Sequence, residues 1–141
     1  MSSLLDIIVV NWNVGDLLAG VVTSIVRYHH NLVSSIIIVD NASTDDSLMQ
    51  VEAIHSLPCQ LTIIRNRENR GFAAACNQGA ALATSDFLLF LNPDTRLFEN
   101  SLPKPLEYLQ LPENSSIAIV GIQLIDENNQ ITRSCSRFPT L

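Results

Sequence analysis

The sequence predicts an α/β fold: a three-layer α/β/α sandwich around a mostly parallel sheet. Short apolar runs alternate with segments of helical spacing, and this alternation is typical of βαβ units. The runs are apolar at every position rather than at alternate positions, which indicates strands buried on both faces of a parallel sheet. Five runs are expected to be its central strands: Ile7–Val10, Ile36–Val39, Leu61–Ile64, Phe87–Leu91 and Ile117–Val120.

Two helices are expected in the first half of the chain. The first follows Asp16, a candidate N-cap, because apolar residues recur at a spacing of four over 17–26 and would line one helix face. The second is expected over Ser47–His55, and Ser43 or Thr44 is placed to cap it.

Two more helices and a hairpin are expected in the second half. One helix opens at Gly71 with small residues, "GFAAACNQGAALA", which allow close packing on the sheet. The other covers Leu102–Leu111, and Pro103 and Pro105 lie in its first turn. Residues 122–134 are expected to form a hairpin that adds to the sheet.

The chain is expected to form one domain over residues 1–141, because no repeat, linker or low-complexity tract interrupts it. No obvious closing element follows the expected hairpin. We therefore expect the domain to be truncated at its C-terminus.

Composition excludes several classes of protein. Hydrophobic residues make up 47% of the chain and charged residues 16%, as in a packed globular domain. The net charge of −6 gives no general electrostatic surface for nucleic acid. No apolar run approaches the roughly 18 residues that span a bilayer, and the N-terminus lacks the features of a signal peptide, so a cytoplasmic location is expected.

Polar residues gather directly after four of the apolar runs, in "NWN", "DNASTDD", "RNRENRGF" and "NPDT". Ligands of parallel sheets bind at the carboxyl ends of the strands, so these segments are expected to line one binding edge. Their chemical groups are an indole, carboxylates, guanidinium groups and amides: Trp12, Asp40, Asp94, Arg65, Arg67, Arg70, Asn11, Asn13, Asn69, Asn77 and Asn92.

This set suits a nucleotide. An indole beside a carboxylate fits a base that stacks on Trp12 and donates an imide N–H to Asp40. Loop arginines and the helix start at Gly71 fit phosphates, and Asp94 fits a divalent cation that bridges them. Each residue also has a structural interpretation: Trp12 as a half-buried core aromatic, Asp40 in an Asx turn, Asp94 as a turn former, and the arginines as a solvated loop.

Absent motifs exclude other chemistries. There is no G-x-x-x-x-G-K-[ST] loop, no G-x-G-x-x-G after the first run and no G-x-S-x-G elbow. A nucleotidyltransferase is less favoured, because its usual glycine-rich basic loop is missing after the first run. A receiver-like module would need a pair of acids where "IIVVNWN" has none.

The segments "IIVVNWN", "IIIVDNASTDDS", "NRENRGFAAACNQGAALATSDFLLFLNPDT" and, more weakly, "GIQLIDENNQITRSCSRFPTL" together resemble the nucleotide-sugar-binding half of inverting family 2 glycosyltransferases. These enzymes have the Rossmann-like GT-A fold. The forms "NRGFAAACNQG" and "LNPDT" are most similar to the rhamnosyltransferase-type branch, whose members build bacterial surface polysaccharides.

The resemblance implies site residues. Asp94 matches the last acid of the family's D-x-D element, the ligand of Mg²⁺ or Mn²⁺, while Asn92 replaces the first acid and can still bind ribose or a metal-bound water. Cys76 stands where members often carry a basic residue, so one diphosphate contact is expected to be either lost or supplied by Arg70. The implied nucleotide-sugar-binding set is Val10, Trp12, Asp40, Asn69, Arg70, Gly71, Asn77 and Asn92.

The resemblance also implies a reaction, the displacement of a nucleoside diphosphate from a sugar by a hydroxyl of a glycan or lipid-linked acceptor. Its general base is expected beyond Leu141, so the chain would carry the donor-binding half. Peripheral membrane association of the full enzyme and self-association of this chain are further expectations. A truncated, non-catalytic nucleotide-binding domain stays open as an alternative.

Overall fold

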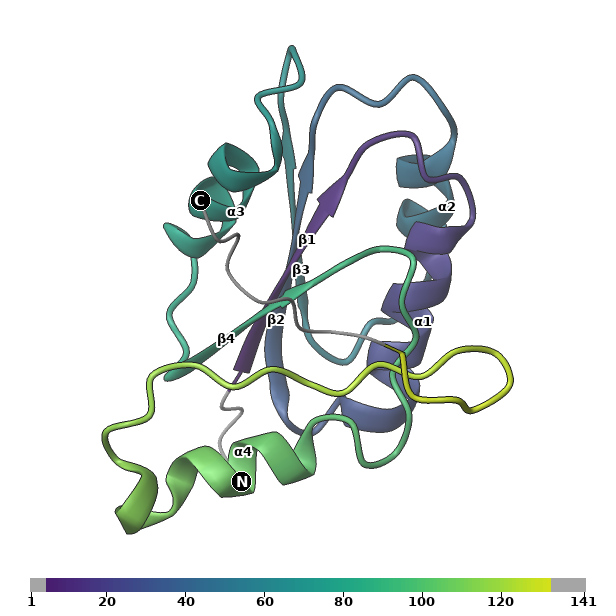
Figure 1. The fold of residues 1–141 in the computed structure, drawn as a ribbon. Helices are drawn as coiled ribbons and strands as arrows, with labels where there is room; N and C mark the ends of the chain where they lie inside the picture. Colours follow the sequence, from purple (N-terminus) through teal and green to yellow (C-terminus); the bar gives the residue numbers. More distant parts are fainter. Residues whose placement is uncertain (1–4, 133–141) are drawn as a thin grey trace, which may run out of the picture. The chain divides into compact units, whose positions relative to one another are not determined.

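The computed structural model describes residues 5–132 (Figure 1). Two compact units make up the chain, Met1–Glu99 and Asn100–Leu141. The prediction of one domain over residues 1–141 stays a prediction. Among the described residues, no helix is both long and apolar enough to cross a membrane.

The first unit is built on a four-stranded sheet in which every pair of neighbours is parallel. Four of the five expected strands are therefore confirmed, as is the α/β fold class. In the order β3-β2-β1-β4 across the sheet, the strands are Gln60–Arg65, Val33–Asp40, Leu5–Asn11 and Phe87–Leu91.

Helices cover both faces of this sheet, which gives the expected three layers. Helix α3 lies on one side, and α1 and α2 lie together on the other (Figure 1). The α3 face is packed through Ile8, Ile37, Val39 and Ala75, all nearly or fully buried. The helices of the first unit are α1 Leu17–His29, α2 Ser47–Glu52 and α3 Phe72–Ala80.

The close approach of α3 depends on Gly79. A Cβ at this position would lie 2.6 Å from Ile8 Cγ2 and 3.4 Å from Val39 Cγ2, and the first distance is too short for a van der Waals contact. The expectation that small residues let this helix pack tightly on the sheet is confirmed.

The prediction that Phe87–Leu91 is covered on both faces is wrong. Strand β4 lies at the edge of the sheet, and Leu88 and Phe90 are 43% and 49% exposed. Phe90 is paired in register with Ile8, so it belongs to the α3 face. Helix α3 packs mainly over β1 and β2. The predicted central position of β3 is also wrong, because β3 forms the opposite edge.

The expected helix caps differ from the structure. Helix α2 is shorter than predicted, with Asp46 at its N-cap position, and neither Ser43 nor Thr44 caps it. The hydroxyl of Ser43 instead bonds to the loop after β1. Helix α1 does begin after Asp16, but the Asp16 side chain makes no capping hydrogen bond.

The second unit begins with α4, Pro103–Gln110, whose first turn contains both expected prolines, and continues through a short 3₁₀ turn, Pro112–Asn114. The expected strand Ile117–Val120 is not formed, because none of the strands within residues 5–132 pairs with it. Ile119 is 88% exposed. The expected hairpin is reduced to one antiparallel bridge between Ile125 and Ile131, and its last two residues, 133–134, lie outside the described residues.

Candidate functional site

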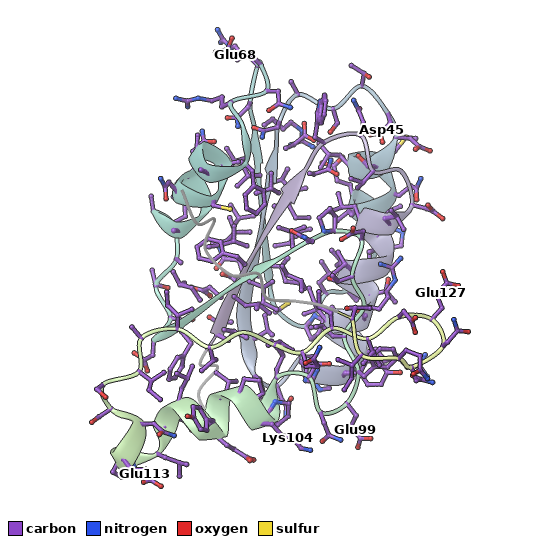
Figure 2. The ribbon with its side chains drawn as sticks, viewed as in Figure 1. Asp45, Glu68, Glu99, Lys104, Glu113 and Glu127 are labelled. Atoms are coloured by element: carbon purple, nitrogen blue, oxygen red, sulfur yellow. The ribbon has the colours of Figure 1, made fainter. Side chains whose placement is uncertain are left out.

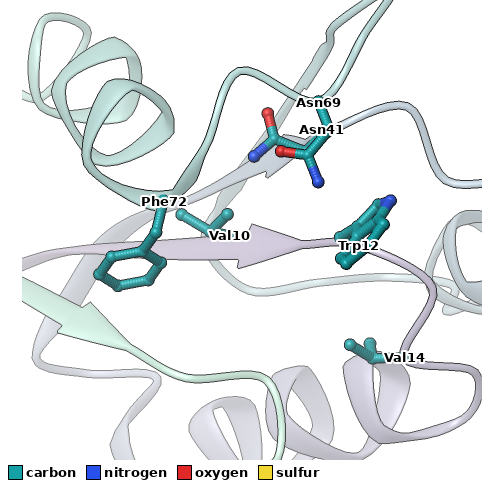
Figure 3. A pocket seen from close by; sticks show the side chains of 6 residues that line it. All are labelled: Val10, Trp12, Val14, Asn41, Asn69 and Phe72. Atoms are coloured by element: carbon teal, nitrogen blue, oxygen red, sulfur yellow. The ribbon is translucent and has the colours of Figure 1, made fainter.

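A shallow pocket of about 230 Å³ lies at the carboxyl ends of β1 and β2, beside the start of α3 (Figure 3). Trp12 forms one wall and is 57% exposed, so it is not the half-buried core aromatic of the structural interpretation. The amides of Asn41 and Asn69 lie close to one another across the pocket from Val14. The full lining is Val10, Trp12, Val14, Asn41, Asn69 and Phe72.

Asp40 lies behind this pocket rather than in its lining. It is 4% exposed, and its Oδ1 accepts a hydrogen bond from Asn11 Nδ2 at 2.7 Å. Its Oδ2 accepts a hydrogen bond from the backbone N–H of Ser43 at 3.1 Å, one residue beyond the spacing of the Asx turn in the structural interpretation. Asn11 Nδ2 also reaches Ser47 Oγ at 2.9 Å, so the carboxylate belongs to a buried polar network.

Asn41 is one of three lining residues that the sequence analysis missed. Val39 packs in the core beneath α3, and side chains two residues apart in a strand share a face. Asn41 therefore continues the α3 face at the strand end, while Asp40 points to the opposite side. This alternation could have identified Asn41, had the α3 face of β2 been known. Val14 and Phe72 were also missed.

Amide hydrogen bonds hold the loop after β3 against α3. Asn41 Oδ1 accepts from Asn66 Nδ2 at 2.9 Å, and Asn66 and Gln78 exchange two hydrogen bonds of 2.9 Å. Asn69 Oδ1 accepts from the backbone N–H of Gly71 at 2.9 Å. Gly71 has φ 82° and ψ 163°, a conformation open to glycine and strained for other residues.

The predicted arginines have different surroundings. Arg65 forms an ion pair with Glu52 on α2, so its charge is already partnered. Arg67 and Arg70 line a second, open hollow of about 490 Å³ together with Arg65, Asn66 and Glu68. Figure 2 shows Glu68 at the tip of the loop after β3.

The remaining predicted residues are exposed and lie outside the pocket lining. Asn77 is on α3, and Asn92 and Asp94 follow β4. Asn92 closes a turn through its carbonyl, which accepts hydrogen bonds from the Thr95 amide at 3.2 Å and the Thr95 hydroxyl at 2.7 Å.

The donor set for a cation is sparse. Among residues 5–132, no three His, Cys, Asp or Glu side chains gather in a group that could hold a metal ion. Asp94 is nevertheless exposed at a strand end. A single carboxylate fits a Mg²⁺-type ion that takes its other ligands from phosphate and water.

A parallel sheet between helix layers, with an exposed indole and amides at the carboxyl ends of its strands, defines a Rossmann-like domain of the GT-A type. The model of the family described as glycosyl transferase family 2 matches residues 6–139 of the sequence. The chain belongs to this family, as the resemblance led us to expect.

Known relatives agree with this assignment. The glycosyltransferase GlyG of Streptococcus pneumoniae is 26% identical over 121 residues, which make up 86% of this chain and 39% of GlyG. A solved mannosyltransferase from Pyrobaculum calidifontis, in complex with GDP-Man and Mn²⁺, has a TM-score of 0.70 and 24% identity, and covers 77% of this chain. TarS of S. aureus in complex with UDP-GlcNAc has a TM-score of 0.67 and 20% identity over 75% of this chain.

The chain is much shorter than these proteins. It spans 39% of GlyG and about a third of each solved chain, 32% for the mannosyltransferase and 31% for TarS. The two solved structures support the fold of the part that they share.

Proposed function

We propose that this chain is the donor-binding part of a glycosyltransferase that transfers a sugar, with inversion, from a nucleoside diphosphate to a glycan or lipid-linked acceptor. The observation that carries the proposal is the pocket in which the exposed Trp12 lies near the amides of Asn41 and Asn69 (Figure 3). The nucleotide sugars bound by the mannosyltransferase and by TarS support it. A donor of the rhamnosyltransferase-type branch remains our expectation.

Trp12 is proposed to stack on the base, because an exposed indole offers a flat apolar surface to any nucleobase. An amide can donate to one base atom and accept from the next. Asn41 is proposed to read the base edge in this way by exchanging its present hydrogen bonds with Asn66 Nδ2 and the Gly71 carbonyl for bonds to the base. The role predicted for Asp40, acceptance of the imide N–H, stays a prediction. The Asp40 carboxylate would have to reach the base from the buried side of the strand end.

The diphosphate is proposed to lie toward Gly71, Arg70 and Asn77, where the free amides at the start of a helix favour negative charge. Asp94 would hold Mg²⁺ or Mn²⁺ there, and Asn92 would bind the ribose or a water of the ion. When bound, the cation offsets the charge that develops on the leaving diphosphate. The general base is expected beyond Leu141.

Further properties of the whole protein are part of the proposal. We expect a cytoplasmic domain whose full-length enzyme associates peripherally with a membrane, where a lipid-linked acceptor would lie. The second candidate is a nucleotide-binding domain without turnover, because the described pocket residues serve binding alone. A nucleotidyltransferase is the least favoured candidate.

Thermal melting with UDP, dTDP and GDP, each with and without Mn²⁺ or Mg²⁺, tests the donor site. We expect at least one nucleotide to raise the melting temperature. Trp12→Ala should weaken the binding of that nucleotide about tenfold or more, since stacking on an aromatic residue contributes about 1–3 kcal/mol. Tyr108→Ala, an exposed aromatic outside the lining, is the matched control. If none of the nucleotides raises the melting temperature, the proposal is contradicted.

The same assay separates the metal role from nucleotide binding. Wild-type protein should bind the nucleotide more tightly with the cation present, and Asp94→Ala should bind it equally with and without the cation. If Asp94→Ala keeps the full metal dependence, Asp94 is not the ligand. A comparison of Asp40→Ala with Asn41→Ala identifies which side chain selects the base.

A further inference from the structure

The end of β1 and the loop that follows it have two faces with different tasks. The even-numbered residues line the pocket, and the odd-numbered residues are hydrogen-bonded to the end of β2 or to the segment after it. Val10, Trp12 and Val14 form the first set, and Asn11, Asn13 and Gly15 form the second. The position of the pocket wall is therefore fixed from behind.

Asn13, the residue directly after Trp12, makes several of these attachments. Its Oδ1 accepts hydrogen bonds from the backbone amides of Thr44 at 2.7 Å and Asp45 at 3.3 Å. Its own backbone N–H donates to Ser43 Oγ at 3.0 Å. One side chain and one amide thus join two loops that are 30 residues or more apart in sequence.

The backbone conformation of Asn13 favours asparagine or glycine. Its φ is 52°, in the left-handed region that asparagine tolerates better than other residues with a Cβ. Gly15, with φ 57°, repeats the conformation and donates its N–H to Asp45 Oδ2 at 2.8 Å. The chain turns at these two constrained positions, directly after Trp12.

The Asp45 carboxylate strengthens the attachment. The hydrogen bond from the Ser47 hydroxyl lowers the pKa of Asp45, burial opposes this effect, and the backbone amides of Gly15 and Ser47 lower the pKa further. Asp45 is thus ionised at neutral pH, and a charged acceptor makes the stronger hydrogen bond to Gly15.

We infer that Asn13 is a positioning residue, which holds the indole of Trp12 in the orientation needed for a nucleobase to stack on it. An exposed aromatic side chain on an unattached loop would be ordered only when the ligand binds, and that cost would weaken affinity. In this chain the loop is ordered in advance through Oδ1 of Asn13. The inference rests on the proposed nucleotide site, because it assigns Asn13 a role in base binding.

Trp12 is the only tryptophan of the chain, so its fluorescence reports on this wall without any ligand. In time-resolved anisotropy, Asn13→Gly should add fast local motion of the indole, because glycine keeps the positive φ but removes Oδ1. Asn13→Asp keeps an acceptor in place and should restore the slow decay. Asn129→Gly is the matched control, since Asn129 also has a positive φ of 58° and does not line the pocket.

Nucleotide affinity provides the second measurement, by calorimetry with whichever of UDP, dTDP or GDP stabilises the wild-type protein. Asn13→Gly should weaken binding by roughly tenfold, the size expected for one lost ordering contact. In the Trp12→Ala background the same substitution should have little further effect, because Asn13 acts through the indole. A merely structural role would weaken binding equally in both backgrounds.

The outcomes separate the inference from the proposed function. Fast indole motion in Asn13→Gly, with a loss of affinity that depends on Trp12, supports the inference. An unchanged anisotropy decay in Asn13→Gly, or a loss of affinity that is the same without Trp12, overturns it. If the wild-type protein binds none of the nucleotides, the proposed function fails, whereas the anisotropy result still decides whether Asn13 orders Trp12.

Discussion

Asp6 is a buried carboxylate near the start of β1, 1% exposed. It accepts hydrogen bonds from Ser35 Oγ at 2.7 Å and from the backbone amides of Thr84 and Ser85 at 2.7 and 2.9 Å. Burial alone would raise its pKa. The hydrogen bonds from Ser35, Ser85 and Thr84 outweigh burial and lower the pKa below 3.8. Asp6 thereby joins β2 and the segment before β4 to β1.

Acid should weaken this junction. Because the folded chain binds the Asp6 proton more weakly than the unfolded chain, its stabilising effect is complete above pH 3.8 and decreases as the pH falls toward the folded pKa. Asp6→Asn should lower the free energy of unfolding by about 1–3 kcal/mol at pH 7, and by less at pH 3. Urea unfolding at both pH values measures this. The control is Asp16→Asn, at an exposed carboxylate without a capping hydrogen bond, which should change the free energy of unfolding little. An equal loss of stability at both pH values for Asp6→Asn would contradict the role assigned to Asp6.

At the scale of single residues, the sequence could predict which segments meet but not which side chain faces the ligand. Trp12 and Asn69 line the pocket as predicted, because they follow strands whose ends share one edge. Asp40 and Asn41 are adjacent, and the pleat of β2 decides between them. A strand that is apolar on both faces carries no pattern that reveals which face α3 will cover.

At the scale of elements, the apolar runs identified β1 to β4, because a strand between two helix layers must be apolar at nearly every position. The order of the strands was beyond the sequence. Both edge strands read as central ones, since β4 contains only large apolar residues and yet has a neighbour on one side alone. The prediction of a strand at Ile117–Val120 was wrong for a related reason, because an apolar run forms a strand only beside another strand with which it can hydrogen-bond.

The packing of α3 on the sheet yields a prediction for one glycine. Gly79→Ala should destabilise the first unit by about 1–3 kcal/mol, the usual cost of overpacking, although alanine is the better helix former. The added Cβ would lie 2.6 Å from Ile8 Cγ2. Thermal or urea unfolding measures the loss. Gly121→Ala, where a Cβ would have no neighbour within 4 Å, is the control. An increase in stability for Gly79→Ala would contradict the prediction and show that the core side chains around Ile8 can move to admit the methyl group.

At the scale of the molecule, strand β4 lies at one edge of the described sheet, and an edge strand is prone to association. Strand β4 has no charge, proline or bulge, which are the usual protections of an edge strand. The opposite edge, β3, carries Gln60, Thr62 and Arg65. Leu88 and Phe90 add exposed apolar surface beside the unprotected edge.

We therefore expect the 141-residue chain to associate with itself through β4. Sedimentation velocity over a range of concentrations should show association of the wild-type protein, and Leu88→Lys should shift it toward monomer because a charge opposes pairing at the edge. Met49→Lys introduces the same charge at another exposed apolar residue, 65% exposed on α2, and should leave association unchanged. A wild-type protein that sediments as a monomer at all concentrations would refute the expectation.

The contact between Gly79 and Ile8 also limits how the pocket can change shape. A methyl group of Ile8 fills the space that a Cβ at position 79 of α3 would occupy. The helix therefore cannot slide along the sheet without a steric clash. The wall at Trp12 is likewise anchored through Asn13. Of the pocket's surroundings, the tip of the loop at residues 67–69 has the fewest attachments. Opening for a ligand should therefore be a local hinge movement of that tip rather than a shear of the helix layer.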